Sequence, residues 1–139
     1  MERSLVLVKP DAMSRGFGGA ILSRLQEKGL KLVALNMLRM DRALAERHYA
    51  VHKGKPFFED LITYIISGPI IAAVFEAEDA IATIRKTMGA TDPAKAEKGT
   101  IRADFGTSIQ ENATHASDSP ETAEKEIKLF FAGKDIFEY

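Results

Sequence analysis

The chain has 139 residues, 45% of them hydrophobic and 28% charged, a composition typical of one folded domain with its own core. With 19 basic and 20 acidic residues, the net charge of -1 lacks the basic surplus of nucleic-acid-binding proteins. The absence of cysteine excludes disulfides and thiolate metal sites, and no apolar run has the pattern of a signal peptide or a membrane span. We therefore expect residues 1–139 to form a single cytoplasmic domain.

The first part of the chain alternates strands and helices. Leu5 to Val8 is a short apolar run typical of a buried strand, and Pro10 ends it. A glycine-rich bend follows, and the apolar spacing that begins at Ile21 predicts a helix ending at Gly29. Residues 31–40 are expected to form a second strand that is buried on both faces at its start. The apolar residues there are Leu32, Val33 and Leu35.

Two helices, a strand and a further helix are expected in the middle of the chain. Asp41 is a suitable N-cap for a short helix that runs to about His52. A longer helix, ended by Gly68-Pro69, is predicted from residues at helical spacing, namely Phe57, Phe58, Leu61, Ile62, Ile65 and Ile66. Residues 70–75 read as a third strand, and residues 79–88 as a helix.

The last third begins with residues 90–113, which show no sustained hydrophobic period. We expect them to form a long ordered loop, because Ile101 and Phe105 can anchor it to the core. A short strand is expected near His115, and Ser119-Pro120 then opens the last helix as N-cap and first residue. This order of elements indicates a single sheet with helices packed on it.

His115 and Glu126 are the first candidates for chemistry. Neutral imidazole is a nucleophile, and a carboxylate that takes the hydrogen of one ring nitrogen frees the other nitrogen to attack. Glu126 borders the buried stripe of the last helix, so it can reach back to His115. The alternative is a surface carboxylate beside two lysines, and the spacing alone leaves the two equally open. Ser117 and Asn112 are candidates to complete the polar cluster.

Three cationic residues could bind phosphate groups, and one aromatic residue could stack on a nucleotide base. Lys9, Arg85 and Arg102 lie at a strand end, on a helix and within the long loop. Most such residues only solvate a surface, but from these positions they can converge on phosphates. Phe57 is either a core residue or an exposed platform on which a base stacks.

Two other patterns are weaker. His48 and His52 have the i, i+4 spacing of a metal pair, but Tyr49 occupies the place of the zincin glutamate and no third ligand is evident, so a metal site is disfavoured. The glycine-rich residues 15–19 fail the dinucleotide fingerprint, because Ile21 stands where the third glycine belongs. We interpret them as a plain turn.

Three separated motifs give the chain a family resemblance. Val8-Lys9-Pro10-Asp11 resembles the opening strand motif of nucleoside diphosphate kinases, and Gly99-Thr100-Ile101-Arg102 resembles their loop motif. The active-site signature of that family is similar to Asn112-x-x-His115-Ala116-Ser117-Asp118, in which Ala116 stands where many members carry glycine. The motifs occur in the right order and span nearly all of the chain.

The resemblance implies an α+β fold with a ferredoxin-like four-stranded antiparallel sheet and helices packed on it. It implies a ping-pong transfer of the γ-phosphate of a nucleoside triphosphate, typically ATP, to a nucleoside diphosphate through a phosphohistidine at His115. In this mechanism Nδ1 of His115 is the nucleophile, Glu126 accepts the Nε2 hydrogen, and Ser117 supports Glu126.

The resemblance also implies the nucleotide contacts. The phosphate-binding residues would be Tyr49, His52, Arg85, Thr91 and Arg102. Lys9 and Asn112 would bind the sugar hydroxyls, with Lys9 also near the transferred group. Phe57 would stack on the base, flanked by Leu61 and Ile109.

The implied cofactor is Mg²⁺, held by the nucleotide phosphates and water without a direct protein ligand, with Asp118 assisting through water. The implied partners are ATP and other nucleoside di- and triphosphates, without nucleic acid or membrane. A homo-oligomer is expected, and the end of the chain at Tyr139 favours a tetramer over a hexamer.

Two other functions remain alternatives. A catalytically silent nucleotide-binding regulatory module would show damage at His115 or Arg102, and both residues are intact. A phosphocarrier would have an exposed histidine without residues that cradle a nucleotide, and Phe57, Arg85 and Thr91 argue against it.

Overall fold

The computed structural model describes residues 1–139, which form four strands and seven α-helices. The strands are β1 (Glu2–Val8), β2 (Lys31–Leu38), β3 (Ile70–Ala77) and β4 (Thr114–Ala116). The helices are α1 (Pro10–Ser14), α2 (Gly18–Glu27), α3 (Arg42–His48), α4 (Phe58–Ile65), α5 (Ala80–Met88), α6 (Ile101–Phe105) and α7 (Pro120–Phe130). None of these helices is both long enough and apolar enough to cross a bilayer.

The four strands form one antiparallel sheet in the order β2-β3-β1-β4. This is the ferredoxin-like arrangement that the resemblance implies, so the predicted fold class is confirmed. The short strand β4 pairs with the end of β1, with His115 opposite Leu7 and Thr114 opposite Val8. The sheet thereby brings residues from the two ends of the chain side by side.

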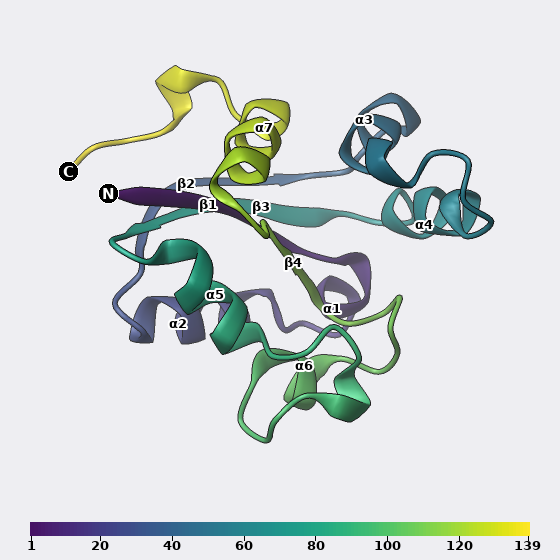
Figure 1. Ribbon diagram of the computed structural model, residues 1–139, viewed down its shortest axis with the longest axis horizontal. Helices are drawn as coiled ribbons and strands as arrows, with labels where there is room; N and C mark the ends of the chain where they lie inside the picture. Colours follow the sequence, from purple (N-terminus) through teal and green to yellow (C-terminus); the bar gives the residue numbers. More distant parts are fainter.

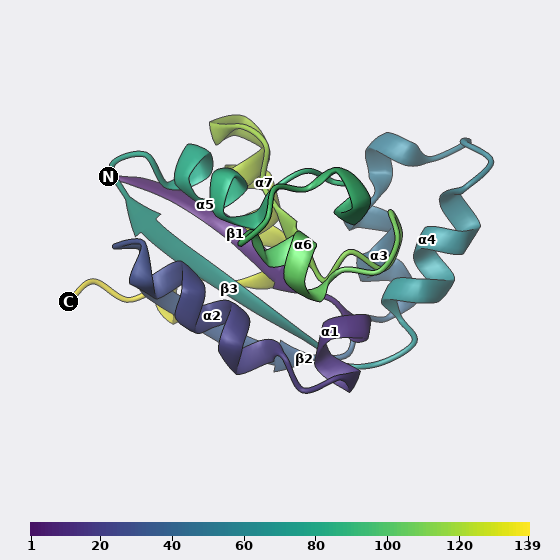
Figure 2. The same ribbon diagram turned by 90° about the horizontal axis from the view of Figure 1, so that it is seen from below.

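Helices cover both faces of the sheet (Figures 1 and 2). On one face, Leu5 and Leu7 of β1 belong to a core with residues of α3, α4 and α7. On the other face, Val6 and Val8 pack in a second core with residues of α2, α5 and α6. Because both faces of β1 are buried, its apolar run is continuous rather than alternating. Each such side chain contributes about 1.5–3 kcal/mol through burial.

The predicted helix starts follow from side-chain caps. Asp41 Oδ1 accepts a hydrogen bond of 2.8 Å from the Leu44 N–H at the start of α3. Ser119 Oγ accepts one of 3.1 Å from the Thr122 N–H at the start of α7. Such caps satisfy backbone donors that have no partner within the helix. Both predicted caps are confirmed.

The prediction of a long loop over residues 90–113 is wrong in one respect. The segment contains α6, capped by Thr100, and a 3₁₀ turn at Pro93–Lys95. The sequence prediction also missed α1. Each of these α-helices has five residues, which is little more than one turn, so neither can display a hydrophobic period.

The predicted burial of Leu35 in β2 is also wrong, because this side chain is 54% exposed. β2 is an outer strand with β3 as its one neighbour, and its register shifts between Leu32 and Ala34. Val33 and Ala34 are consequently both buried in the same core, and Leu35 follows them on the exposed part of the strand. An edge strand lacks the second neighbour that would cover it.

Candidate active site

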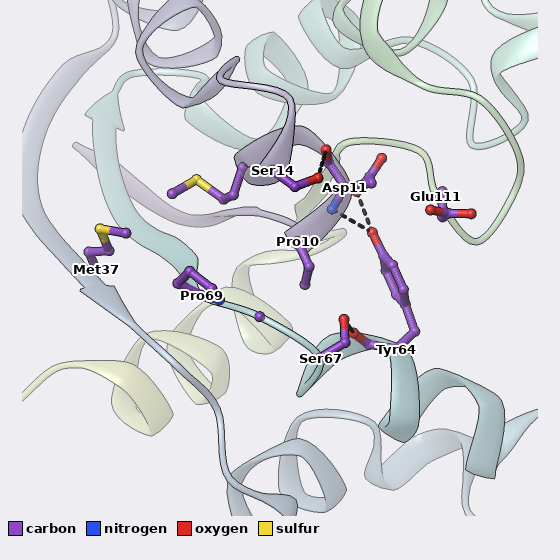
Figure 3. A pocket seen from close by; sticks show the side chains of 10 residues that line it. Pro10, Asp11, Ser14, Met37, Tyr64, Ser67, Pro69 and Glu111 are labelled. Carbon is purple, nitrogen blue, oxygen red and sulfur yellow. Dashed lines mark hydrogen bonds between the residues drawn. The ribbon is translucent and has the colours of Figure 1, made fainter.

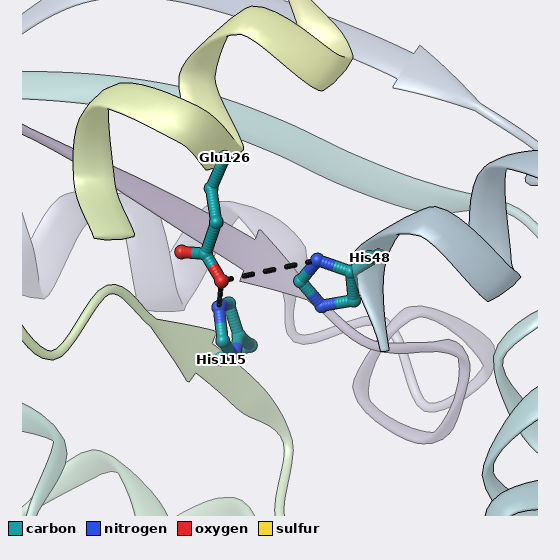
Figure 4. Close-up of side chains that lie close together, drawn as sticks. All are labelled: His48, His115 and Glu126. Atoms are coloured by element: carbon teal, nitrogen blue, oxygen red, sulfur yellow. Dashed lines mark hydrogen bonds and ion pairs between the residues drawn. The ribbon is translucent and has the colours of Figure 1, made fainter. Parts of the chain in front are cut away.

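His115 lies in the middle of β4 and contacts a carboxylate of α7. Its Nε2 lies 2.9 Å from Oε2 of Glu126 (Figure 4). The Ser117 hydroxyl donates to Oε1 of the same carboxylate at 2.7 Å. Ser117 Oγ in turn accepts a hydrogen bond of 3.2 Å from the Leu5 N–H of β1. A chain of hydrogen bonds thus connects the sheet backbone to the imidazole.

This arrangement decides between the two interpretations of Glu126. Glu126 is buried, with 8% exposure, so the surface-carboxylate alternative is wrong. Burial alone raises the pKa of Glu126, but the hydrogen bond and charge of His115, with the bond from Ser117, lower it below the usual value. The ionised carboxylate accepts the Nε2 hydrogen, and Nδ1 of His115 is left without a protein hydrogen bond. That nitrogen is free to act as a nucleophile.

Lys9, directly after β1, and Asn112, shortly before β4, form a polar pair. Lys9 Nζ donates to Asn112 Oδ1 at 2.9 Å, and Asn112 Nδ2 donates to the Thr91 carbonyl oxygen at 3.0 Å. Burial, and then repulsion from Arg102, lowers the pKa of Lys9 to about 8. A bound anion would favour the charged form of this side chain.

Arg102 is a second buried cation in the same region. Its guanidinium donates to the Gly89 carbonyl at 3.1 Å and to the Thr114 carbonyl at 2.9 Å, while its Nε has no partner. Burial, and then the charge of Arg85, lowers the pKa of Arg102 to about 10. No carboxylate forms an ion pair with Lys9, Arg85 or Arg102. This cationic region is suited to phosphate groups.

Phe57 is exposed at the start of α4, in contrast to its neighbour in the sequence. Phe57 is 45% exposed, whereas Phe58 is 8% exposed and belongs to the core. The His52 ring lies against Phe57, with 5.4 Å between their centroids, and Tyr49 follows at 6.2 Å from His52. In the loop after α6, Ile109 is 63% exposed. Of the two interpretations of Phe57, the structure therefore supports an exposed platform.

His48 joins the site, which the sequence did not predict. Its centroid is 4.7 Å from that of His115, its Nδ1 is 3.9 Å from Oε2 of Glu126, and neither of its ring nitrogens has a hydrogen-bond partner. His52 lies instead beside Phe57, because α3 ends at His48 and a 3₁₀ turn follows. The i, i+4 spacing was the only signal at His48, and it indicated a metal pair rather than a contact to His115.

The ligand atoms of His48, His115 and Glu126 all lie within 4.8 Å of one another, close enough to consider a metal ion. Both carboxylate oxygens of Glu126, however, already accept hydrogen bonds from His115 and Ser117. A cation here would replace the Nε2 hydrogen of His115 and break the pair. We therefore assign this cluster to the orientation of His115 and not to a metal.

The buried neutral state of His48 makes stability depend on pH. Burial, and then repulsion from His115, lowers the pKa of His48 from 6.5 to about 3. Between these values the unfolded chain binds a proton at residue 48 that the folded chain does not, so stability falls as the pH decreases. Below pH 6.5 we expect the free energy of unfolding to fall less steeply with decreasing pH in His48→Phe than in the parent chain. The two slopes should differ by up to about 1.4 kcal/mol per pH unit.

Urea denaturation at a series of pH values measures this difference. His52→Phe is the matched control, because the same exchange at a more exposed ring should change the slope much less. A His48→Phe variant as acid-sensitive as the parent chain would contradict the assignment.

Comparisons with known proteins show the family of this chain. The family model described as nucleoside diphosphate kinase matches residues 2–136. A nucleoside diphosphate kinase of Dehalococcoides mccartyi is 58% identical over 139 residues, which is 100% of this chain and 98% of that protein.

Solved structures are similar over the same range. The nucleoside diphosphate kinase of Aquifex aeolicus superposes with a TM-score of 0.95 at 47% identity, covering 98% of this chain and 99% of that one. The halophilic enzyme of Halobacterium salinarum, solved in complex with CDP, gives a TM-score of 0.96 at 45% identity, covering 99% and 92%. The resemblance seen in the three motifs thus extends along the whole chain, which belongs to the nucleoside diphosphate kinase family of phosphotransferases.

Proposed function

We propose that His115 carries the phosphoryl group in the reaction of this family, the transfer of the γ-phosphate of a nucleoside triphosphate to a nucleoside diphosphate. The observation that carries the proposal is the 2.9 Å contact between Nε2 and Glu126, which leaves Nδ1 open. A single nucleotide site then serves donor and acceptor in turn, which gives ping-pong kinetics. Residues 1–139 act as one domain in this proposal.

The first half-reaction uses the lone pair of Nδ1. A bond forms between Nδ1 of His115 and the γ-phosphorus while the bond from that phosphorus to the bridging oxygen breaks, and the nucleoside diphosphate leaves. The ring keeps its Nε2 hydrogen and gains positive charge, which the Glu126 carboxylate stabilises. Ser117 holds this carboxylate in place. The second half-reaction reverses these steps with the acceptor diphosphate.

The cations bind the phosphates and neutralise the charge of the transferred group. We assign this role to Lys9, Arg85 and Arg102, since none is neutralised by a protein carboxylate. Phosphoryl transfer depends mainly on positioning and charge stabilisation, and these residues provide both. The remaining proposed phosphate contacts are Tyr49, His52 and Thr91.

The sugar and the base of the nucleotide lie in the space between α4 and the loop after α6. Lys9 and Asn112 bind the sugar hydroxyls, and the base stacks on Phe57 between Leu61 and Ile109. The exposure of Phe57 and Ile109 supports this position, and the similar Halobacterium salinarum enzyme was solved with CDP. Stacking without hydrogen bonds to the base edges accounts for acceptance of many bases.

The donor set fits a Mg²⁺ ion that arrives with the nucleotide. The groups assigned to the phosphates are cationic or neutral, and Asp118, the carboxylate next to Ser117, is exposed and has no hydrogen-bond partner that would occupy it. Mg²⁺ commonly keeps its waters and binds mainly through substrate phosphates, where it offsets charge on the β- and γ-oxygens. Asp118 would contact it through water.

We further propose a homo-oligomer, with a tetramer favoured over a hexamer. The outer strand β2 exposes Leu35 at 54% and Met37 at 62%, an apolar edge suited to pairing with another copy. Light scattering on the purified chain should give a mass of four chains, and a monomer would contradict the proposal. The cytoplasmic location stays a prediction.

The phosphohistidine is tested directly with γ-labelled ATP. The parent chain should become labelled, the label should be stable in base and labile in acid, and GDP should discharge it as GTP. His115→Ala should bind nucleotide and take up no label, because the attacking nitrogen is missing. No label on the parent chain would favour the silent module, whereas label that GDP cannot remove would favour the phosphocarrier.

The base platform is tested with Phe57→Ala. Stacking contributes about 1–3 kcal/mol per base, so we expect KM to rise by at least about fivefold for purine and pyrimidine diphosphates alike. Steady-state kinetics with GDP and CDP measures both values. Val51→Ala is the matched control, since Val51 is exposed in the same segment and has no assigned contact. A rise in KM for one base class alone would contradict a platform that tolerates every base.

A further inference from the structure

The backbone is strained just before the nucleophile. Ala113 has a φ of +72° and is the only residue other than glycine with a positive φ. The Thr114 N–H donates to the Asn112 carbonyl at 2.9 Å, which closes a three-residue γ-turn around Ala113. A γ-turn with positive φ is rare and strained in L-residues, and it persists only where the surroundings hold it.

Two residues after β1 bind both backbone polar groups of Ala113. Oδ2 of Asp11 accepts the Ala113 N–H at 3.0 Å, and the Lys9 N–H donates to the Ala113 carbonyl at 2.9 Å. Asp11 is buried, with 7% exposure, and its carboxylate forms no ion pair. Burial of a carboxylate destabilises a protein unless its oxygens accept hydrogen bonds. The burial of Asp11 therefore depends on the hydrogen bonds that its two oxygens accept.

The other carboxylate oxygen of Asp11 binds α4. Oδ1 accepts a hydrogen bond from the Tyr64 hydroxyl, whose oxygen accepts the Asp11 N–H at 3.0 Å (Figure 3). Burial, and then the hydrogen bond to Asp11, raises the pKa of Tyr64, so the hydroxyl keeps its proton. Asp11 thus joins α1, the Ala113 turn and α4.

We propose that Asp11 is a positioning residue for phosphoryl transfer, which holds the strained Ala113 turn with one carboxylate oxygen and the helix that follows Phe57 with the other. The inference rests on the proposed function. A rotation about φ of residue 113 moves the chain before the turn relative to the chain after it. Asn112, which pairs with Lys9, lies on one side, and His115 lies on the other. Asp11 therefore sets how the nucleophile faces the bound phosphates.

The decisive experiment compares Asp11→Ala in two backgrounds, the parent chain and the Ala113→Gly variant. The rate of phosphoenzyme formation at saturating ATP is measured in a single turnover. Without the carboxylate, the Ala113 turn can relax away from its positive φ and displace His115. A displacement of reacting groups by about 1 Å can slow a reaction about 100-fold, and we expect a loss of this size. Glycine adopts positive φ without the penalty of a Cβ, so in the Ala113→Gly background we expect the same change to cost at most about tenfold.

This comparison separates positioning of the turn from mere packing. Loss of packing around Asp11 would reduce the rate by the same factor in both backgrounds, and that result would overturn the proposal, as would a full rate in Asp11→Ala. If Asp11→Ala does not fold by circular dichroism, Asp11→Leu replaces it in the same pair. Leucine has no polar side-chain atom, so it can accept a hydrogen bond from neither Ala113 nor Tyr64.

The link to α4 is tested with Tyr64→Phe, which leaves the Asp11–Ala113 bond intact. We expect KM for nucleoside diphosphates to rise severalfold while kcat changes less, because α4 follows the base platform and not His115. Ser14→Ala is the matched control: Ser14 is exposed, and its hydroxyl bonds the Asp11 carbonyl at 3.0 Å rather than the carboxylate. Equal kinetics in Tyr64→Phe and the parent chain would remove α4 from the proposal.

Labelling of the parent chain distinguishes a failure of the proposed function from a failure of the role of Asp11. If it forms no phosphoenzyme, the proposed function is overturned. If it forms one and Asp11→Ala forms it equally fast, the function stands and the role of Asp11 is wrong.

Discussion

The pairing of β4 with the end of β1 is the contact on which the rest of the site depends. It has only three residue pairs, yet it places His115 opposite Leu7. At one end the Leu5 N–H binds Ser117, and at the other the Lys9 N–H binds the carbonyl of Ala113. The buried faces of β1 anchor this contact in both cores, so His115 rests on the most deeply buried strand of the sheet.

The charged groups around this strand are buried at a cost in stability when no ligand is bound. Burial lowers the pKa of Lys9 and Arg102, and neither side chain forms an ion pair with a carboxylate. The carboxylates that are buried nearby, Asp11 and Glu126, are occupied by hydrogen bonds to Ala113, Tyr64, His115 and Ser117. The site therefore separates its charges: the acidic groups orient protein atoms, and the cations remain available to an anionic substrate.

Several elements could be predicted because their signals are local. Asp41 and Ser119 are N-cap residues that indicate where α3 and α7 begin. The apolar residues of α4 repeat often enough to show a helical period. The segment around α6 could not be predicted in this way, since its five residues give no period and its helix depends on the Thr100 cap and burial of Ile101. The exposure of Leu35 depends on the place of β2 in the sheet, which no local pattern contains.

The sequence by itself determined the chemical types of the site and their order: a histidine before a capped helix, a carboxylate on that helix, and cations in distant motifs. The tertiary structure decided which of them meet. It buried Glu126 against His115, brought the unpredicted His48 beside both, and joined Asp11 to Ala113 across 102 positions of the chain. Such contacts depend on strand register and helix packing, which are properties of the whole fold and not of any short segment.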